Sequence, residues 1–431
     1  MKNVGLISLG CAKNLVDSEN ILGLLSKDHF NIVTNYEDAD IIIINTCGFI
    51  ESSKKESIDT IFDTLKYGKK VVVTGCLVER YYHELRKEIP EVDLFIPIRD
   101  YYRFNALLST ICDEVKDKKR GVTDENRIVS TGDFSAYLKI GEGCSNRCSY
   151  CAIPIIRGDF VSRNPESIIK EAKKLAEVGY KELVVLQQDT TKYGVDLKDP
   201  NINIVYLLNE LLKVKSLDYI RLLYLYPDEI TDELIDLIAS EPRLTPYFDI
   251  PIQHSEDEIL EAMNRRGNKE FLRNLFNKIR EKCPNAILRT TVMVGFPGET
   301  EEQFNGLLDF IKEIEFDHLG CFTYSREENT PAFNYLDQID EEIKQDRLDK
   351  VMKLQQNISY RKNKNHIGEI MEGLVVGKDG EYYCLRSYWN APDDVDGKIL
   401  FKADNELKLG DKVKVKINSA FVYDLLGELV L

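Results

Sequence analysis

Between residues 137 and 324, short apolar stretches alternate six times with amphipathic stretches, and this alternation constrains the fold most strongly. The predicted strands are Tyr137–Ile140, Leu183–Gln187, Tyr219–Leu225, Tyr247–Ile252, Leu288–Val294 and His318–Tyr324. The helices predicted between them are Pro165–Val178, Ile204–Lys213, Asp232–Ser240, Lys269–Lys282 and Glu301–Ile314. Right-handed crossovers between parallel strands make such a series of units curl into a barrel. Because a TIM barrel closes with eight units, six predict a partial (β/α)6 barrel with a lateral mouth for a large substrate.

The regions on either side of this barrel show different patterns. Before it, β-branched runs separated by helical patterns predict a parallel sheet covered on both faces. These strands are Val4–Leu9, Ile41–Asn45 and Val71–Thr74, and the helices are Asp17–Leu25, Ser52–Leu65 and Glu79–Lys87. After it, a charged helix over Asp340–Asn365 leads into short strands that predict a small antiparallel β-barrel of the OB type. These strands are Ile370–Val376, Tyr382–Ser387, Lys398–Phe401, Lys412–Asn418 and Leu426–Val430.

The chain is therefore expected to be a multi-domain α/β protein. Its 431 residues correspond to about three domains at roughly 150 residues each. The expected divisions are an N-terminal domain over 1–115, a polar linker over 116–132, the partial barrel over 133–366 and the small barrel over 367–431.

Composition narrows the class of partner and the compartment. The formal net charge is −16, which argues against a phosphate-binding surface along the whole chain. No apolar run approaches the roughly 20 residues that span a bilayer, so an integral membrane protein is not expected. The N-terminus is too short and polar for a signal peptide. We expect a cytoplasmic protein with no membrane partner, in which the ten cysteines do not form a disulfide framework.

Cys144, Cys148 and Cys151 follow the first predicted barrel strand with C-x3-C-x2-C spacing. Three thiolates this close bind three corners of a 4Fe–4S cluster and leave one iron open to a small molecule, since no fourth cysteine is nearby. A zinc site would require a fourth cysteine or histidine, usually from a second C-x2-C half. Unrelated core thiols are the other alternative. The specific spacing favours the cluster.

Cys11, Cys47 and Cys76 are far apart in the sequence, but each follows a predicted strand of the N-terminal domain. The carboxyl ends of parallel strands lie at one edge of a sheet, where ligands bind. Buried thiols are the alternative, because cysteine is among the most buried residue types. Three at equivalent strand ends favour a second three-cysteine 4Fe–4S cluster. The remaining cysteines are expected to serve packing: Cys112, Cys283, Cys321 and Cys384.

The motif around Cys144, on the first loop of a β/α barrel, resembles that of the radical S-adenosylmethionine (radical SAM) superfamily. The resemblance implies that the open iron binds the amino and carboxylate groups of S-adenosylmethionine. The reduced cluster then cleaves the sulfonium and yields a 5′-deoxyadenosyl radical, which abstracts hydrogen from a C–H bond. Tyr150 matches the aromatic position near the adenine, with ordinary packing as the alternative.

Other candidate contacts lie at predicted strand ends, where barrel active sites gather. In the resemblance, the loop with Gly295, Gly298 and Glu299 lies against the methionine half of the cofactor; a simple tight turn is the alternative. Gln188 ends the second strand and is a further candidate for cofactor binding. His254 either is structural or takes a direct part in the site. Arg265 and Arg266 either meet a carboxylate or are exposed at a helix end.

The whole chain, with its two cysteine sets and its small barrel, resembles the methylthiotransferases, whose C-terminal module is the TRAM domain. The resemblance makes all six cysteines catalytic as cluster ligands, with the second cluster tied to sulfur insertion. A methyl group from one S-adenosylmethionine ends on that sulfur, and the radical from another activates the substrate carbon. An electron donor such as flavodoxin or ferredoxin, and a source of sulfur, are implied as partners.

Two branches of this family differ in substrate. The RimO branch modifies the β-carbon of an aspartate in ribosomal protein twelve of the small subunit, and the MiaB branch modifies an adenosine in tRNA. The stretches 8–19 and 186–194 are similar to RimO, and the acidic run 391–397 resembles an insert in the RimO TRAM domain. Residues 368–431 hold 8 basic and 12 acidic residues, which suits a basic protein target better than RNA.

Alternatives remain for this last region and for the function as a whole. The acidic run is otherwise a solvated loop. Tyr388 and Trp389 are either contact anchors or core residues. The chain is expected to be the protein-directed methylthiotransferase. The alternatives are the tRNA-directed enzyme and a non-catalytic iron–sulfur protein that carries electrons or senses oxygen.

Overall fold

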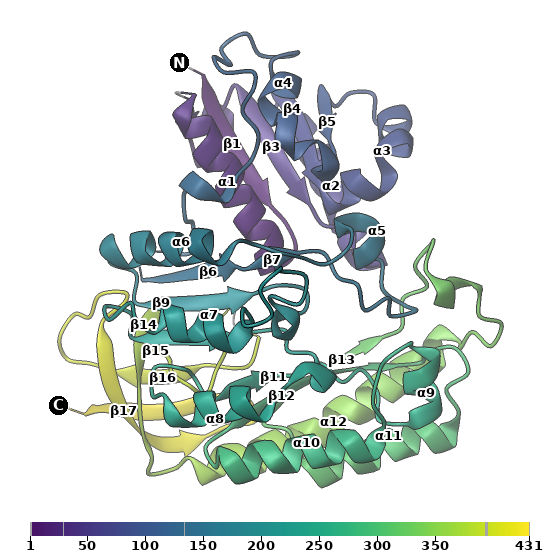
Figure 1. Cartoon of the computed structure of the whole chain (residues 1–431), viewed down its shortest axis with the longest axis vertical. Helices are drawn as coiled ribbons and strands as arrows, with labels where there is room; N and C mark the ends of the chain where they lie inside the picture. Colours follow the sequence, from purple (N-terminus) through teal and green to yellow (C-terminus); the bar gives the residue numbers. More distant parts are fainter. Residues whose placement is uncertain (1, 29, 133, 393–394, 431) are drawn as a thin grey trace.

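A computed structural model describes residues 2–28, 30–132, 134–392 and 395–430. The N-terminal sheet lies at one end of the long axis, the β/α barrel occupies the middle, and the C-terminal barrel packs beside it (Figure 1). Across the described residues, no helix is both long enough and apolar enough to cross a lipid bilayer.

The N-terminal domain is a parallel five-stranded sheet in the order β2-β1-β3-β4-β5. Its strands are β1 (Asn3–Ser8), β2 (Asn31–Ile32), β3 (Ile41–Thr46), β4 (Lys70–Gly75) and β5 (Leu94–Ile96). Its helices are α1 (Ala12–Lys27), α2 (Glu51–Leu65), α3 (Cys76–Glu88) and α4 (Phe104–Leu108). Every residue of β3 is buried, which agrees with an isoleucine-rich strand covered on both faces. The predicted helix over 17–25 begins earlier, directly after Cys11.

The middle domain is an open barrel of six parallel strands, as predicted. The strands are β6 (Ser135–Lys139), β9 (Glu182–Leu186), β10 (Tyr219–Leu222), β11 (Tyr247–Asp249), β12 (Ile287–Val294) and β13 (His318–Thr323). The sheet β6-β9-β10 meets the sheet β11-β12-β13 through a bridge between Ile220 and Leu244. Within the described residues β6 and β13 do not pair with each other, so the barrel is open between its first and last strands.

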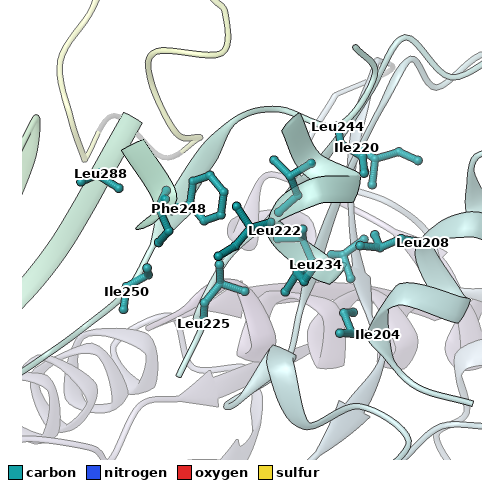
Figure 2. Close-up of a cluster of buried hydrophobic side chains, with 14 of the residues drawn as sticks. Ile204, Leu208, Ile220, Leu222, Leu225, Leu234, Leu244, Phe248, Ile250 and Leu288 are labelled. Atoms are coloured by element: carbon teal, nitrogen blue, oxygen red, sulfur yellow. The ribbon is translucent and has the colours of Figure 1, made fainter. Parts of the chain in front are cut away.

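Helices cover the outside of this barrel and bury its branched side chains. They are α6 (Pro165–Glu177), α7 (Ile204–Leu211), α8 (Asp232–Ser240), α10 (Lys269–Lys282), α11 (Glu301–Ile314) and α12 (Glu341–Asn365). Figure 2 shows Leu222 and Phe248 of the strands among Leu208 and Leu234 of the helices. The sequence pattern did not predict α5 (Ile153–Arg157), α9 (Asp257–Ala262) or the hairpin of β7 (Gly141–Glu142) and β8 (Val161–Ser162).

Two barrel strands end earlier than the apolar runs predicted. Tyr224, inside the predicted strand 219–225, has a φ of +62°, and Gln253 beyond β11 has a φ of +69°. Residues with side chains rarely adopt this left-handed region, and such strained positions cluster at functional sites. The backbone therefore turns sharply at the carboxyl ends of β10 and β11.

The C-terminal domain is a closed barrel in the order β14-β15-β16-β18-β17. Its strands are β14 (Ile370–Asp379), β15 (Tyr382–Arg386), β16 (Ile399–Lys402), β17 (Lys412–Ala420) and β18 (Leu425–Val430). The prediction of a wholly antiparallel barrel is wrong for one pair, since β16 and β18 run parallel. The other neighbours pair in the antiparallel sense.

This small barrel packs on the amino ends of the β/α strands. Arg221 of β10 donates to the carbonyl oxygen of Ser387 at 2.7 Å, and Arg386 pairs with Glu182 of β9 at 2.6 Å. His318 of β13 lies 2.8 Å, Nε2 to oxygen, from the carbonyl of Trp389, whose side chain is only 1% exposed. Trp389 is therefore a core residue of the junction and not a surface anchor.

The acidic run 391–397 also contributes to this junction. Asp396 is buried, accepts from Tyr247 Oη at 2.6 Å and pairs with Arg289 Nε at 3.3 Å. Burial alone would raise the pKa of Asp396, but His318, Arg289 and its hydrogen bonds lower it on balance. The expectation of an acidic run facing a basic target is thus wrong for Asp396. Asp393 and Asp394 lie outside the described residues.

Candidate functional site

The three separated cysteines of the N-terminal domain lie at the carboxyl ends of neighbouring strands. Cys11 follows β1, Cys47 follows β3, and Cys76 follows β4, in a sheet where β1, β3 and β4 are adjacent. Gly10, with a φ of +87°, lies so close that a Cβ there would be 2.9 Å from Cys47 Cβ. The predicted convergence on one sheet edge is therefore seen.

The thiols of this set are close enough for the charge of one to affect the pKa of the others. Burial raises the pKa of Cys47, and it raises that of Cys76 to about 11, with the negative charges of the neighbouring thiolates adding to the effect. Cys11 remains exposed at the edge. Among the described residues, no three His, Cys, Asp or Glu side chains are grouped closely enough to bind a single metal ion. A cluster attaches each thiolate to a different iron.

The second set lies on the loop after β6 and β7. Cys144 donates its N–H to the carbonyl oxygen of Gly158 at 3.2 Å, and Cys151 donates its N–H to that of Cys148 at 3.0 Å. Burial raises the pKa of Cys144 and Cys151, and the charge of Cys148 adds to this in both cases. A raised pKa keeps these groups protonated until a metal binds and displaces their protons. Three cysteines in one short loop are the donor set of an iron–sulfur cluster with one open iron.

The two sets are neighbours in space. Cys76 packs against Ala152, the residue that follows Cys151, and against Ile156 of α5. The sheet edge of the N-terminal domain and the cysteine loop of the barrel therefore face one another across a short distance.

Arg265 is part of this site, and its predicted alternative as an exposed helix-end residue is wrong. Its side chain is buried, donates to Tyr150 Oη at 3.2 Å, and lies 4.4 Å from the centre of the Tyr226 ring. Its Nη1 is 3.9 Å from Cys148 Sγ, and Tyr226 Oη is 3.8 Å from the same sulfur. Arg266, in contrast, is exposed and pairs with acidic residues of the η5 turn (Pro227–Glu229).

Glu299 stabilises the loop from Gly295 to Gly298, which follows β12. This buried carboxylate accepts from the N–H of Gly295 and from Arg347 Nη1, the latter at 3.1 Å. His254 Nε2 lies 3.4 Å from the other carboxylate oxygen of Glu299. Since His254 is also fully buried, its surroundings fit the structural role that was one of its two predicted alternatives. A Cβ at Gly298 would meet nothing within 4 Å, so the backbone there is open to an approaching ligand.

Gln187 and Gln188, at the end of β9, differ in their contacts. Gln188 Nε2 donates to Glu142 Oε1 at 2.7 Å. The amide group of Gln187 is fully buried, and neither its nitrogen nor its oxygen has a hydrogen-bond partner among the described residues. A buried polar group without a partner is costly, and a polar ligand is one way to satisfy it. No pattern in the sequence distinguishes Gln187 from its neighbour.

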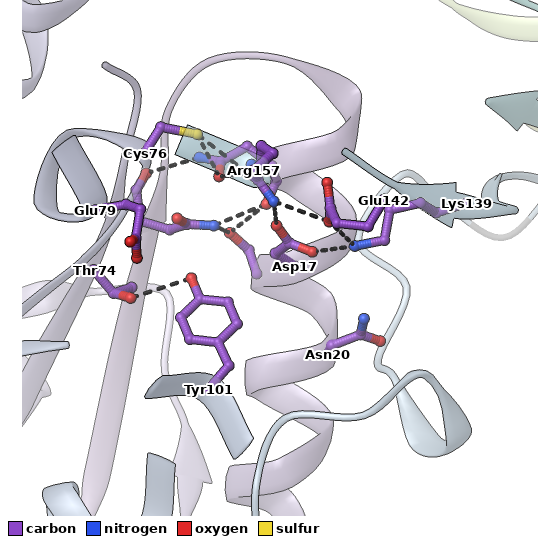
Figure 3. A network of polar contacts seen from close by, with 12 residues as sticks. Asp17, Asn20, Thr74, Cys76, Glu79, Tyr101, Lys139, Glu142 and Arg157 are labelled. Carbon is purple, nitrogen blue, oxygen red and sulfur yellow. Dashed lines mark hydrogen bonds and ion pairs between the residues drawn. The ribbon is translucent and has the colours of Figure 1, made fainter. Parts of the chain in front are cut away.

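A buried polar network joins the two cysteine sets (Figure 3). Arg157 of α5 donates to Cys76 Sγ at 3.2 Å and pairs with Asp17 of α1 and with Glu142 of β7. Lys139 of β6 pairs with the same two carboxylates. Burial alone would raise the pKa of Glu142, but Lys139 and Arg157 lower it to about 2. Glu142 also accepts the N–H of Gly143, which precedes Cys144, at 3.1 Å.

This network predicts a large effect of neutralising Asp17. In Asp17→Asn, the buried cations Lys139 and Arg157 keep Glu142 as an anionic partner, but its side chain is 32% exposed and compensates less for their burial. Breaking a buried ion pair costs about 3–5 kcal/mol. We expect a loss of that size in the free energy of unfolding, measured by urea denaturation followed by circular dichroism. The control is Asp63→Asn, whose pair with Lys66 is exposed to solvent, so that no measurable loss of stability is expected. Equal effects of the two substitutions would contradict a structural role for the network.

Comparison with known families divides the chain in three. Residues 3–97 match the uncharacterized protein family UPF0004, residues 138–311 match the radical SAM superfamily, and residues 367–430 match the TRAM domain.

Curated relatives match over the full length. A protein of Alkaliphilus oremlandii is 47% identical over 434 residues, covering 99% of each chain. One of Clostridioides difficile is 46% identical over 442 residues, covering 100% of this chain and 99% of its own. Both are named ribosomal protein uS12 methylthiotransferase RimO.

Solved structures share the fold at low sequence identity. The radical S-adenosylmethionine methyltransferase TsrM of Kitasatospora setae superposes with a TM-score of 0.56 at 15% identity, over 74% of this chain and 73% of its own. The cobalamin-dependent S-adenosylmethionine radical enzyme OxsB gives 0.52 at 12% identity, over 83% of this chain and 56% of its own. These likenesses concern the fold alone.

Proposed function

Because the chain belongs to the radical SAM methylthiotransferases, within the family of its RimO relatives, we propose that it adds a methylthio group to the β-carbon of an aspartate in ribosomal protein uS12. The observation that carries the proposal is the junction of the two cysteine sets. Cys76 packs against Ala152, and one buried network connects Cys76 with the loop of Cys144. Clusters bound at these two adjacent cysteine sets would be able to act on the same substrate.

The residues present fit the groups that this reaction requires. We assign one 4Fe–4S cluster and S-adenosylmethionine to Cys144, Cys148 and Cys151, and the auxiliary 4Fe–4S cluster to Cys11, Cys47 and Cys76. The unpaired buried amide of Gln187 and the open backbone at Gly298 fit a polar cofactor at the carboxyl end of the barrel. When bound, these groups supply the reductive cleavage of S-adenosylmethionine and the sulfur chemistry.

The chain's own residues position and enclose these groups. Arg265 and Tyr226 cover Cys148 and keep water from that side of the loop. Glu299, with Arg347 behind it, orients the loop from Gly295 to Gly298. Tyr150, Gln188, Gly295, Gly298 and Glu299 are proposed as the residues that contact or frame the cofactor. Glu299 would act through its loop, since its oxygens already contact groups of the protein.

Further parts of the proposal concern partners and organisation. An electron donor of the flavodoxin or ferredoxin type would reduce the clusters, and a separate sulfur source would restore the auxiliary site. We place the reaction in the cytoplasm. The proposed units are 1–115, with the auxiliary cluster, a linker over 116–132, the radical SAM barrel over 133–366, and the TRAM domain over 367–431.

The test offers two substrates to one preparation. The protein is reconstituted anaerobically with iron, sulfide, a reductant and S-adenosylmethionine. It then receives either a peptide covering the target loop of uS12 or unmodified tRNA. We expect mass spectrometry to show a methylthio gain on the peptide alone, and none on a peptide with the target aspartate changed to alanine. A gain on tRNA alone would refute the protein substrate, and an absorption spectrum unchanged by S-adenosylmethionine would refute the enzyme.

A further inference from the structure

Lys13 is a buried cation without an anionic partner. It lies in the first turn of α1, two residues after Cys11, and is 8% exposed. Its ammonium is 3.3 Å from the centre of the Tyr224 ring. Within the described part of the chain, its side-chain ammonium has no hydrogen bond and no ion pair; the contact with the Tyr224 ring is the one that the structure gives it. A cation–π contact offsets only part of the cost of removing an unpaired ammonium from water.

Three other cations near the site pair with carboxylates. Lys139 and Arg157 share two carboxylates, as described above. Arg289 of β12 pairs with Asp249 at 2.7 Å and with Asp396 at 3.3 Å. Lys13 therefore differs from these three cations, because its side chain is largely buried and its ammonium has no carboxylate partner among the described residues. An ammonium in such surroundings favours an anion that arrives with a ligand.

The position of Lys13 lies between the two proposed cluster sites. Its contact, Tyr224, is the left-handed residue beyond β10, fixed by an N–H donated to Asp249 Oδ2 at 2.9 Å. Two residues further, Tyr226 contacts Cys148. On the other side, Lys13 follows Cys11, and the charges of both act on the Tyr224 phenol. A group bound at the Lys13 ammonium would thus lie between Cys11 and Cys148.

We propose that Lys13 binds the side-chain carboxylate of the substrate aspartate and makes the enzyme specific for an acidic residue. The inference rests on the proposed function and names a substrate contact within it. An ammonium recognises a carboxylate as a point charge, and the Tyr224 ring beneath it restricts where that charge lies. Anchoring the carboxylate places the adjacent β-carbon between the two sites, which is the positioning that a reaction at that carbon needs.

The test compares an aspartate peptide with its asparagine analogue on three proteins. These are the wild type, Lys13→Met and Lys13→Arg, and the control is Lys55→Met, which removes an exposed lysine of the same domain. Dissociation constants of labelled peptides are measured by fluorescence anisotropy, and kcat/KM by mass spectrometry. We expect Lys13→Met to lose roughly 100-fold in binding and kcat/KM for the aspartate peptide, and to lose the preference over asparagine. Lys13→Arg should keep that preference, and Lys55→Met should match the wild type.

Measurements other than methylthiolation distinguish a loss of cofactor binding from a loss of substrate recognition. Iron and sulfide content, the electron paramagnetic resonance signal and peptide-independent cleavage of S-adenosylmethionine should be unchanged in Lys13→Met. Loss of any of these would overturn the proposal, because Lys13 would then support the cofactor sites or the fold. An unchanged aspartate preference in Lys13→Met, with an active wild type, would overturn the inference alone. A wild type that neither binds nor modifies the aspartate peptide would overturn the proposed function and the inference together.

Discussion

Replacement of Cys148 by alanine is expected to abolish the reductive cleavage of S-adenosylmethionine. Cys148 is the most buried sulfur of its loop and lies under Tyr226 and Arg265. Without it, two cysteines remain near the loop, too few to hold a cluster with one open iron. We expect 5′-deoxyadenosine formation, measured by chromatography after reduction with dithionite, to fall at least about 1000-fold, towards the uncatalysed rate.

The matched control for this variant is Cys283→Ala. Cys283 is equally a buried thiol of the barrel domain, but it lies after α10 and packs in the hydrophobic core. This variant should lose some stability and retain cleavage. Retained cleavage in Cys148→Ala would remove Cys148 from the ligand set.

Replacement of Cys47 by alanine should separate the two steps of the reaction. Cys47 lies against Gly10 on the sheet edge of the N-terminal domain, on a different segment of the chain from the loop of Cys144. We expect loss of about half of the bound iron, since one of two equal clusters is lost. Methylthiolation of the peptide should disappear, whereas peptide-independent cleavage of S-adenosylmethionine should remain within a few-fold of the wild type.

Cys112→Ala is the control within the same domain, because Cys112 is buried in the core of the N-terminal domain. It should retain both clusters and both activities. Equal loss of cleavage in Cys47→Ala and Cys148→Ala would contradict the division of labour between the two sites.

Much of the fold could be predicted from the sequence because its elements have strong periodic patterns. The helices α10 and α11 have the predicted bounds, with their caps at Asn268 and Thr300. The errors occur where tertiary contacts decide the backbone. The predicted strand over 219–225 continues through Tyr224, but the left-handed turn there follows from its N–H bond to Asp249, which no local pattern encodes.

The cysteines of the candidate site could be predicted, because their positions follow from short sequence spacing or from the order of parallel strands. The spacing of Cys144, Cys148 and Cys151 is local, and the convergence of Cys11, Cys47 and Cys76 follows from parallel strands. The network around Arg157 joins residues from four separate segments, so spacing gave no indication of it.

Within the acidic run, the prediction was wrong for Asp396 for a related reason. Its composition suggested a solvated surface or a recognition insert, but composition does not reveal which neighbouring domain a loop packs on. Asp396 lies inside the junction because Arg289 and Tyr247 of the barrel reach it there. The buried ammonium of Lys13 was missed because a lysine near a helix start is ordinarily exposed.

The burial of Trp389 has an optical consequence. It is the one tryptophan of the chain, and it lies where the TRAM barrel meets the β/α barrel, with its ring against His318 and His366. All tryptophan emission of the protein therefore originates at that junction. The fluorescence of the unlabelled protein therefore reports locally on whether the TRAM barrel is packed against the β/α barrel.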